Sequence, residues 1–211
     1  SSQATMISSA ELHAALQRNE SGALADSVLR VLPIESKYNV GVSVVRRSRV
    51  NGKTPPDAIV HDAITEVYQI IEGKGVLVTG GTLESPTPFP NDGPIVRQII
   101  GPSSSGKAIL GGTRRNVGAG DIVVIPPHTA HGFVDITTKQ IVYTLIRIDP
   151  QRILELRSEA KNIVAGICHL TIRSSRHRFV ASVLRLSYAS ANLLLLRAQL
   201  NSGVRVQHGL L

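Results

Sequence analysis

Two histidines lie three positions apart, directly after a double proline, in residues 118–133, GAGDIVVIPPHTAHGF. An imidazole can be a metal ligand or a general acid or base, whereas a histidine in a surface turn is usually only solvated. The chain has just seven histidines and one cysteine, so a thiolate metal cluster is excluded. The chemistry of His128 and His131 therefore depends on whether another segment supplies ligands.

A second candidate group lies in residues 59–68, IVHDAITEVY, which contain His61 and Glu66. On one continuous strand, their odd separation would put the two side chains on opposite faces of the sheet. If residues 62–65 form a tight turn, His61 ends one strand, Glu66 begins its neighbour, and both point to one spot. With His131 as third ligand, two imidazoles and one carboxylate can hold a divalent ion and leave positions open for substrate.

The segments that must position these residues are predicted to be short strands. Glycine or proline separates apolar runs from Tyr38 onward, which predicts strands at residues 40–45, 66–71, 76–78, 95–100, 108–110, 122–125, 132–136 and 141–148. Residues 72–75 are expected to turn the second of these strands into the third. Ser8 followed by Glu11 predicts a helix that ends by Asn19. Many short strands without interleaved helices are typical of an all-β barrel or sandwich.

Residues 101–107, GPSSSGK, fit the pattern of a phosphate-binding loop, G-x-x-x-x-G-K. Such a loop requires Ser or Thr next, to hold Mg²⁺, and then a helix that faces the phosphate. Ala108 follows instead, and Ile-Leu-Gly-Gly after it is a poor helix start. We expect a flexible hairpin loop here, and a loop over one end of the barrel at residues 80–94.

Two motifs of this region resemble those of the cupin superfamily. The first has the form H-x(4)-E-x(6)-G, and the second has the form G-x(5)-P-x-G-x(2)-H. In this chain they fall on His61, Glu66, Gly73, Gly120, Pro126 and His131. The resemblance covers residues 38–150 and implies an all-β fold, a cupin-type jelly-roll β-barrel. The body is also similar to small, often secreted, single-domain cupins of unassigned function.

The resemblance implies one divalent metal ion, Fe, Mn, Zn or Ni without distinction, with the ligands His61, Glu66 and His131. The sequence departs from the motifs at two positions. Ile59 stands where the first motif has an earlier histidine, and His128 stands where the second motif has its glycine. A fourth ligand is therefore missing. Three readings stay open: a three-ligand centre, a centre that recruits Asp62 or His128, and an empty site.

Five further side chains are candidates to line a pocket: Tyr68, Phe133, Tyr143, His128 and Asp62. For the three aromatic residues, the alternative role is to fill the barrel core. His128 is otherwise a solvated residue at the tip of a turn, and Asp62 is otherwise a turn residue. No residue is assigned a catalytic role.

The net charge of +8 is concentrated at the C-terminal end. After Lys161 the chain has six arginines and no acidic residue, whereas the body is nearly balanced, which argues against a nucleic-acid groove there. We predict a helical arm at residues 1–21, the barrel at 22–155 and a basic extension at 156–211. Residues 178–199 can be drawn as a helix that contacts a membrane surface or a partner, and a poorly ordered extension is the alternative.

These observations predict a metal-binding barrel that acts on a small oxygen-rich organic molecule. The chemistry is dioxygenase-like if the metal is Fe(II), and isomerase-like or lyase-like with Zn²⁺, Mn²⁺ or Ni²⁺. The alternative is a non-catalytic small-molecule binding barrel that has lost a full metal site. A small-molecule ligand and a homodimer are the expected partners. The chain begins Ser-Ser-Gln, without Met, so either a signal peptide has been removed or the sequence has been trimmed, and a secreted or periplasmic protein is slightly favoured over a cytoplasmic one.

Overall fold

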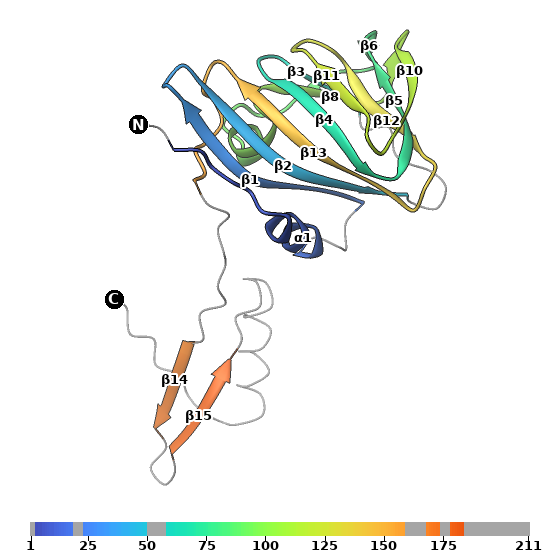
Figure 1. The fold of residues 1–211 in the computed structure, drawn as a ribbon. Coiled ribbons are helices and arrows are strands. Elements are labelled where there is room, and N and C mark those ends of the chain that lie inside the picture. Colours follow the sequence, from blue (N-terminus) through green and yellow to red (C-terminus); the bar gives the residue numbers. More distant parts are fainter. Residues whose placement is uncertain (1–2, 19–22, 50–57, 159–167, 174–177, 184–211) are drawn as a thin grey trace. The chain divides into compact units, whose positions relative to one another are not determined.

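A computed structural model of the chain describes residues 3–18, 23–49, 58–158, 168–173 and 178–183. The chain divides into two compact units, Ser1–Ala160 and Lys161–Leu211. The first unit holds the helix and thirteen of the strands, and the second holds β14 (Cys168–Arg173) and β15 (Arg178–Val183) (Figure 1). The domain boundaries drawn from the sequence stay predictions.

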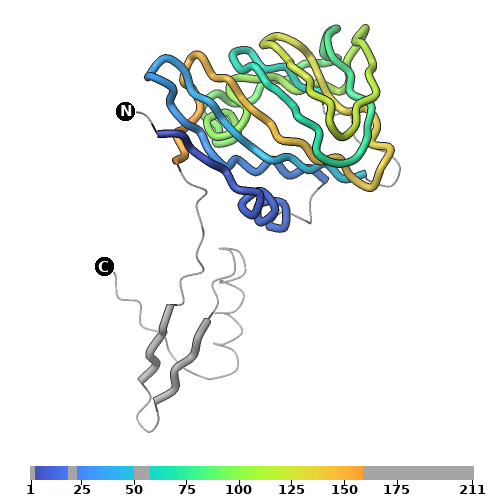
Figure 2. The backbone as a smooth tube through the Cα atoms, viewed as in Figure 1, coloured from blue at the N-terminus to red at the C-terminus, as the bar shows by residue number. Residues whose placement is uncertain are grey.

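Two antiparallel sheets make up most of the first unit, and the chain passes from one to the other several times (Figures 1 and 2). The five-stranded sheet has the order β1 (Leu24–Ile34), β2 (Tyr38–Ser48), β13 (Gln140–Asp149), β4 (Thr65–Glu72), β11 (Ile122–Ile125). The six-stranded sheet has the order β10 (Thr113–Gly118), β5 (Lys74–Thr79), β12 (His131–Ile136), β3 (Ala58–His61), β8 (Ser103–Gly106), β7 (Thr87–Pro88). The short strands β6 (Thr82–Leu83) and β9 (Ile109–Leu110) pair with each other. The predicted all-β jelly roll is confirmed.

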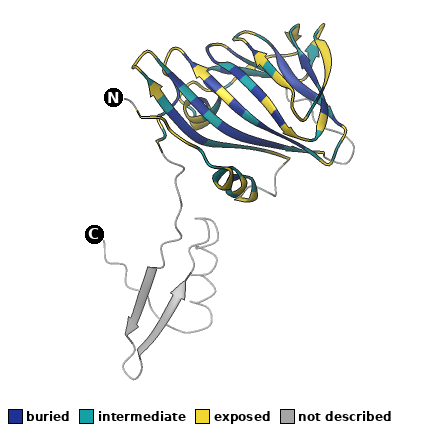
Figure 3. Cartoon of the chain, viewed as in Figure 1, coloured by how far each residue is buried: buried dark blue, intermediate teal, exposed yellow. Residues whose placement is uncertain are grey.

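The core lies between the two sheets because alternate residues of each strand point inward. Buried residues alternate with more exposed ones from Thr65 to Ile70 in β4 and from Tyr143 to Asp149 in β13 (Figure 3). Tyr68 and Tyr143 from the five-stranded sheet meet Leu77 and Phe133 from the six-stranded sheet in one buried cluster. The inner face of the five-stranded sheet therefore carries every odd-numbered position from Tyr143 to Arg147.

The helix α1 (Ser9–Arg18) packs on the outer face of β1 and β2. Its predicted cap is confirmed, because the backbone N–H of Glu11 donates to Ser8 Oγ at 3.2 Å. Ala15 is fully buried against Val44, and Glu11 pairs with Arg30 at 2.6 Å. The helix thus covers one part of the outer face of the sheet.

The predicted hairpin of residues 66–71 and 76–78 is wrong in its pairing. Both segments are strands, β4 and β5, but β4 lies in the five-stranded sheet and β5 in the six-stranded sheet. Gly73 has φ +84°, and it carries the chain from one sheet to the other.

The strand predicted at residues 95–100 is a short π-helical segment, η1 (Val96–Ile100). Backbone hydrogen bonds from Val96 and Arg97 to Gly93 start this turn, and the four-residue spacing buries Val96 and Ile100 together. Apolar residues at this spacing satisfy a helical turn as well as a strand, so periodicity did not distinguish the two.

The hairpin loop predicted at residues 101–107 is in part a strand, since β8 pairs with β3 and β7. Short strands, and no helix, follow it, in agreement with the rejection of a phosphate loop. The loop predicted at residues 80–94 contains two short strands, β6 and β7. The strands β1 and β10 were not predicted from the sequence pattern.

In the second unit, β14 and β15 form an antiparallel pair. The helix drawn for residues 178–199 is wrong over β15, and its remainder lies outside the described residues. Membrane-surface contact by this extension stays a prediction. Among the described helices, none is long and apolar enough to cross a bilayer.

Candidate metal centre

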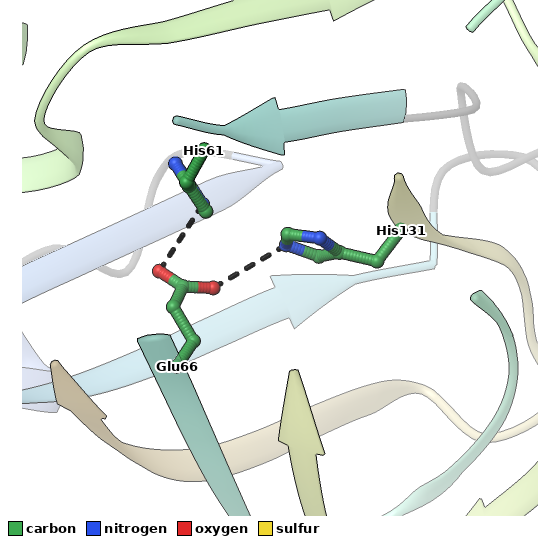
Figure 4. A group of neighbouring side chains, drawn as sticks. All are labelled: His61, Glu66 and His131. Carbon is green, nitrogen blue, oxygen red and sulfur yellow. Dashed lines mark ion pairs between the residues drawn. The ribbon is translucent and has the colours of Figure 1, made fainter. Parts of the chain in front are cut away.

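The two histidines and the glutamate named from the sequence come together between the sheets. His61 is the last residue of β3, Glu66 the second residue of β4, and His131 the first residue of β12 (Figure 4). One ligand atom from each lies within 4.8 Å of those of the others, and all three side chains are buried. The short turn after His61 allows both side chains to point inward, as predicted, although β3 and β4 belong to opposite sheets.

Glu66 is at the centre of the group, and its carboxylate has four polar neighbours. Oε1 lies 3.4 Å from His61 Nε2 and accepts a hydrogen bond from Arg147 Nε at 3.0 Å. Oε2 lies 3.3 Å from His131 Nε2 and accepts one from the Tyr68 hydroxyl at 2.8 Å. The carboxylate is thus fixed from both sides, with each oxygen facing one imidazole.

The hydrogen bond of His131 assigns its tautomer. His131 Nδ1 lies 2.9 Å from the carbonyl oxygen of Thr129, which can only accept, so Nδ1 carries the proton. In the neutral ring, Nε2 then presents a lone pair toward Glu66, and this buried atom has no hydrogen-bond partner. Two acceptors that face each other repel, unless a cation lies between them.

His61 is oriented in the same sense by Ser103. The Ser103 hydroxyl donates its one proton to a backbone carbonyl, with Gly101 O at 2.9 Å and Ile100 O at 3.2 Å. With that proton on a carbonyl, the hydroxyl accepts from His61 Nδ1 at 2.7 Å, and in this tautomer His61 Nε2 also presents a lone pair toward Glu66. Hydrogen bonds of this kind orient the histidine ligands of metal sites.

These donor atoms fit a divalent ion. Two lone pairs and a carboxylate converge, which is the donor set of transition-metal sites with open positions. Donor atoms that share a tetrahedral ion with bonds of about 2.1 Å are about 3.4 Å apart. His61 Nε2 and His131 Nε2 lie 3.4 and 3.3 Å from Oε1 and Oε2 of Glu66, so one ion would bind both carboxylate oxygens or draw one of them closer to both rings. A proton on each imidazole is the other way to satisfy the same contacts.

Arg147 links Glu66 to the far edge of the sheet. Besides its bond to Glu66, its guanidinium donates to Ser43 Oγ at 2.9 Å and pairs with the carboxylate of Asp26. The four residues come from β4, β13, β2 and β1, so one polar network crosses four adjacent strands. Burial acts to lower the pKa of Arg147, but Asp26 and Glu66 outweigh it and raise this pKa.

The same neighbours keep Glu66 ionised. Burial by itself would raise the pKa of the Glu66 carboxyl. With a proton on each imidazole, the charges of His61 and Arg147 and the hydrogen bonds that His131 and His61 then donate hold this pKa well below its usual value. Burial and the adjacent Glu66 raise the pKa of Tyr68 well above its usual value, so its hydroxyl remains a donor to Glu66.

A cavity of about 270 Å³ adjoins the three candidate ligands. Its walls are mainly apolar and include Ile59 on β3, Ile99 on η1 and Leu145 on β13. Phe89, from the connection predicted to lie over one end of the barrel, also lines it. A small molecule in this cavity would reach the three candidate ligands between mainly apolar walls.

The five pocket candidates separate into three groups. Tyr68 and Tyr143 line the cavity, and their rings stack with centroids 4.5 Å apart. Phe133 fills the core and lines a different cavity on the outer side of β12. His128 and Asp62 are exposed and do not line the cavity. Neither His128 nor Asp62 is therefore positioned as a fourth metal ligand.

Sequence reasoning missed Arg147, Asp26 and Ser103. A signal for Arg147 was present, because it shares the parity of the predicted interior residue Tyr143, and an inward Glu66 needs a cationic partner. Asp26 lies on β1, which was not predicted, and Ser103 lies in the segment predicted to be a loop.

Comparison with known proteins supports the fold. The family model of the AraC-like ligand binding domain, which has a cupin-type fold, matches residues 105–207, slightly under half of the chain. Together with the two facing antiparallel sheets, this match decides the fold. The chain is a cupin-fold protein. The matched residues include His131 but begin after His61 and Glu66, so the match does not bear on the complete metal group.

Solved structures with a cupin fold are similar to this chain at low identity. An uncharacterised protein with a double-stranded β-helix domain from Klebsiella pneumoniae subsp. pneumoniae is 14% identical, with a TM-score of 0.44, over 72% of this chain and 94% of that one. A cupin protein from Bacteroides fragilis is 16% identical, with a TM-score of 0.32, over 59% of this chain and 77% of that one. These similarities carry no information on activity.

A recombinant oxalate oxidase in complex with glycolate is 20% identical, with a TM-score of 0.40, over 64% of this chain. The match spans 56% of the length of the oxalate oxidase chain. No curated protein matches this cupin-fold chain.

Proposed function

We propose that this cupin-fold protein is a metal-dependent enzyme that acts on a small oxygen-rich organic molecule. One divalent ion, held by His61, Glu66 and His131, would act on the bound molecule as a Lewis acid or, as Fe(II), bind O₂ beside it. The observation that carries the proposal is the pair of buried imidazoles whose Nε2 atoms face one carboxylate, with His131 Nε2 left without a hydrogen-bond partner.

The residues around the ligands have separate tasks in this proposal. Thr129 and Ser103 fix the two imidazole tautomers, and Arg147 and Tyr68 fix the carboxylate of Glu66. Because these contacts already hold the donor atoms in place, little reorganisation accompanies metal binding. The apolar cavity walls would keep bulk water from the bound molecule.

Elemental analysis of protein purified without added metal tests this proposal. We expect about one transition-metal ion per chain in the wild type, and its loss in the His61→Ala, His131→Ala double variant. His128→Ala is the matched control, since this exposed histidine is outside the cavity, and it should keep the metal. If the metal is iron, oxygen uptake in the presence of candidate substrates separates the dioxygenase-like from the isomerase-like or lyase-like activity.

A non-catalytic ligand-binding barrel is the second candidate function. Two observations favour it: the similarity to the AraC-like ligand binding domain, and Ile59 at the position of the first motif's earlier histidine. Arg147 also compensates the charge of Glu66 without any metal ion. Protein that carries no metal, as isolated and after incubation with Fe²⁺, Mn²⁺, Zn²⁺ and Ni²⁺, would favour this second function.

A further inference from the structure

The cavity beside the candidate ligands has two chemically different walls. Among the described residues that line it, the carboxylates and guanidinium groups all belong to strands of the five-stranded sheet: Asp26, Arg47, Glu66 and Arg147. The other wall is formed by β3, β8, Phe89 and the η1 segment. Apart from the candidate imidazoles, its polar side chain is Ser105, whose hydroxyl donates to the carbonyl oxygen of Thr87 at 3.5 Å. A small molecule between the two walls therefore meets polar groups on one side and mainly hydrocarbon on the other.

Four residues form the isoleucine wall of the cavity: Ile59, Ile95, Ile99 and Ile100. Its inner end lies beside the candidate ligands. Ile59 is directly opposite His131 in the register of β3 and β12. The carbonyl oxygen of Ile100 lies 3.2 Å from Ser103 Oγ, and that hydroxyl oxygen is 2.7 Å from His61 Nδ1. A molecule that reaches the ion of the proposed function therefore has hydrocarbon next to it.

The outer end of the isoleucine wall reaches solvent. Ile95 is 43% exposed, and Leu24 on β1, which lines the same cavity, is 46% exposed. Single exposed apolar residues are common, but two at the rim of one cavity give it an apolar mouth. The η1 segment is held from outside the cavity, because the backbone N–H of Glu155 donates to the carbonyl oxygen of Arg97 at 2.8 Å and their side chains form an ion pair. The hydrocarbon surface therefore does not depend on a bound ligand.

The size of the cavity limits the length of the ligand. Because a cavity of about 150 Å³ holds benzene, the cavity of about 270 Å³ holds about ten non-hydrogen atoms. We propose that the small molecule of the proposed function is amphipathic, with its oxygens in a head that reaches the ion and an aliphatic chain of about three to five carbons along the isoleucine wall. This inference rests on the proposed function, because the ion holds the head.

Titration calorimetry on the Zn²⁺-loaded full chain tests the inference with three hydroxamates that share one head. The head binds Zn²⁺ at the positions that three protein ligands leave open. Acetohydroxamate has the shortest chain, pentanohydroxamate has three more CH₂ groups, and β-methoxypropionohydroxamate has the length of pentanohydroxamate with an oxygen in place of one CH₂. Each buried CH₂ tightens binding by at most about fourfold, which corresponds to about 0.8 kcal/mol. We expect pentanohydroxamate to bind at least about tenfold tighter than acetohydroxamate and at least about threefold tighter than the methoxy probe.

Ile99→Asn tests the isoleucine wall itself, since Ile99 is half-buried and lines the cavity. We expect this variant to lower the ratio of the pentanohydroxamate and acetohydroxamate affinities by at least about threefold. The acetohydroxamate affinity and the Zn²⁺ content should stay as in the wild type, which a general loss of structure would not allow. Leu110→Asn is the matched control, because this apolar residue is exposed on β9 and does not line the cavity, and it should leave the ratio unchanged.

Each outcome bears on a different proposal. Equal affinities for the three hydroxamates in protein that holds Zn²⁺ would overturn the aliphatic-chain inference and leave the metal centre in place. An unchanged ratio in Ile99→Asn would overturn the position of the chain on the isoleucine wall. Protein that takes up no Zn²⁺ would instead overturn the proposed function. The comparison of probes on the wild type decides the inference even if Ile99→Asn fails to fold.

Discussion

Glu66 has two kinds of cationic partner that compete for the same carboxylate. Arg147 already donates to Oε1, the oxygen that also faces His61. A metal ion on the two imidazoles would share this oxygen with the guanidinium. Arg147 therefore stabilises the carboxylate in the absence of metal and weakens its interaction with a metal ion when one is bound.

Arg147→Met tests this double role. Without metal, the substitution leaves the buried carboxylate of Glu66 and the half-buried carboxylate of Asp26 without this cation, and a broken buried ion pair costs about 3–5 kcal/mol of unfolding free energy. Added Zn²⁺ should recover part of this loss, because the ion compensates Glu66. Urea unfolding with and without Zn²⁺ measures both effects.

The control is Arg97→Met, which removes an exposed ion pair with Glu155 and should cost less than about 1 kcal/mol in either condition. A loss for Arg147→Met that is the same with and without Zn²⁺ would contradict the double role.

Ile59 is the position at which the site lacks a ligand. In the register of β3 and β12 it lies directly opposite His131, and it shares the inward face of β3 with His61, two residues away. Ile59→His should therefore add a fourth ligand, the third nitrogen, and tighten Zn²⁺ binding by on the order of tenfold or more, about 1.4 kcal/mol. Competition with a chromophoric chelator measures the affinity. Val60→His places the same group on the opposite face of β3, and it should leave the affinity unchanged.

At the scale of elements, the glycines of the two motifs serve the backbone. Gly73, between β4 and β5, has φ +84°, and Gly120, before β11, has φ +97°. Both are conformations that other residues rarely adopt. His128, at the position of the second motif's remaining glycine, also has a left-handed backbone, with φ +61°. The departure at His128 thus changes the side chain and keeps the turn.

Gly73→Ala and Gly120→Ala form a matched pair. At Gly120 a Cβ would meet nothing within 4 Å, so the substitution should cost only the left-handed backbone, about 1–2 kcal/mol. At Gly73 the Cβ would lie 2.1 Å from the backbone oxygen of Gln140, a contact that only backbone movement can relieve. We expect Gly73→Ala to be clearly the more destabilising in urea unfolding. Equal losses of unfolding free energy for the two variants would contradict this expectation and mean that the backbone between β4 and β5 moves at little cost.

The alternation of inward and outward side chains along single strands predicted much of the site. Contacts between segments far apart in the sequence could not be predicted from this alternation. The turn after His61 and the inward face of Glu66 were both predicted from spacing within ten residues, and both are confirmed. Which strands pair, by contrast, depends on packing across the barrel, so the 66–78 hairpin was wrong. Asp26, 40 positions before Glu66 in the sequence, joins the network through Arg147 for the same reason of long-range packing.

At the scale of the whole molecule, the five-stranded sheet has an apolar outer face. Val42, Ile146, Val67 and Val124 are successive cross-strand neighbours on β2, β13, β4 and β11. Ile146 is 39% exposed and Val124 61% exposed. In the described part of the chain, α1 covers Val44 and Val142 on this face but not this row. Contiguous apolar patches of this kind mark interfaces more often than free surface.

The expected homodimer can be placed on this outer face. A second copy presents the same row of uncharged, β-branched side chains, and two such sheets can pack face to face about a twofold axis. We predict a solution mass of twice 22.6 kDa by light scattering for the wild type. Val124→Lys puts a charge on the most exposed of these positions and should yield the single-chain mass. Leu110→Lys changes an equally exposed apolar residue on β9, outside the row, and should leave the dimer intact. A wild type with the mass of one chain at every concentration would contradict this interface, and so would a Val124→Lys variant that remains dimeric.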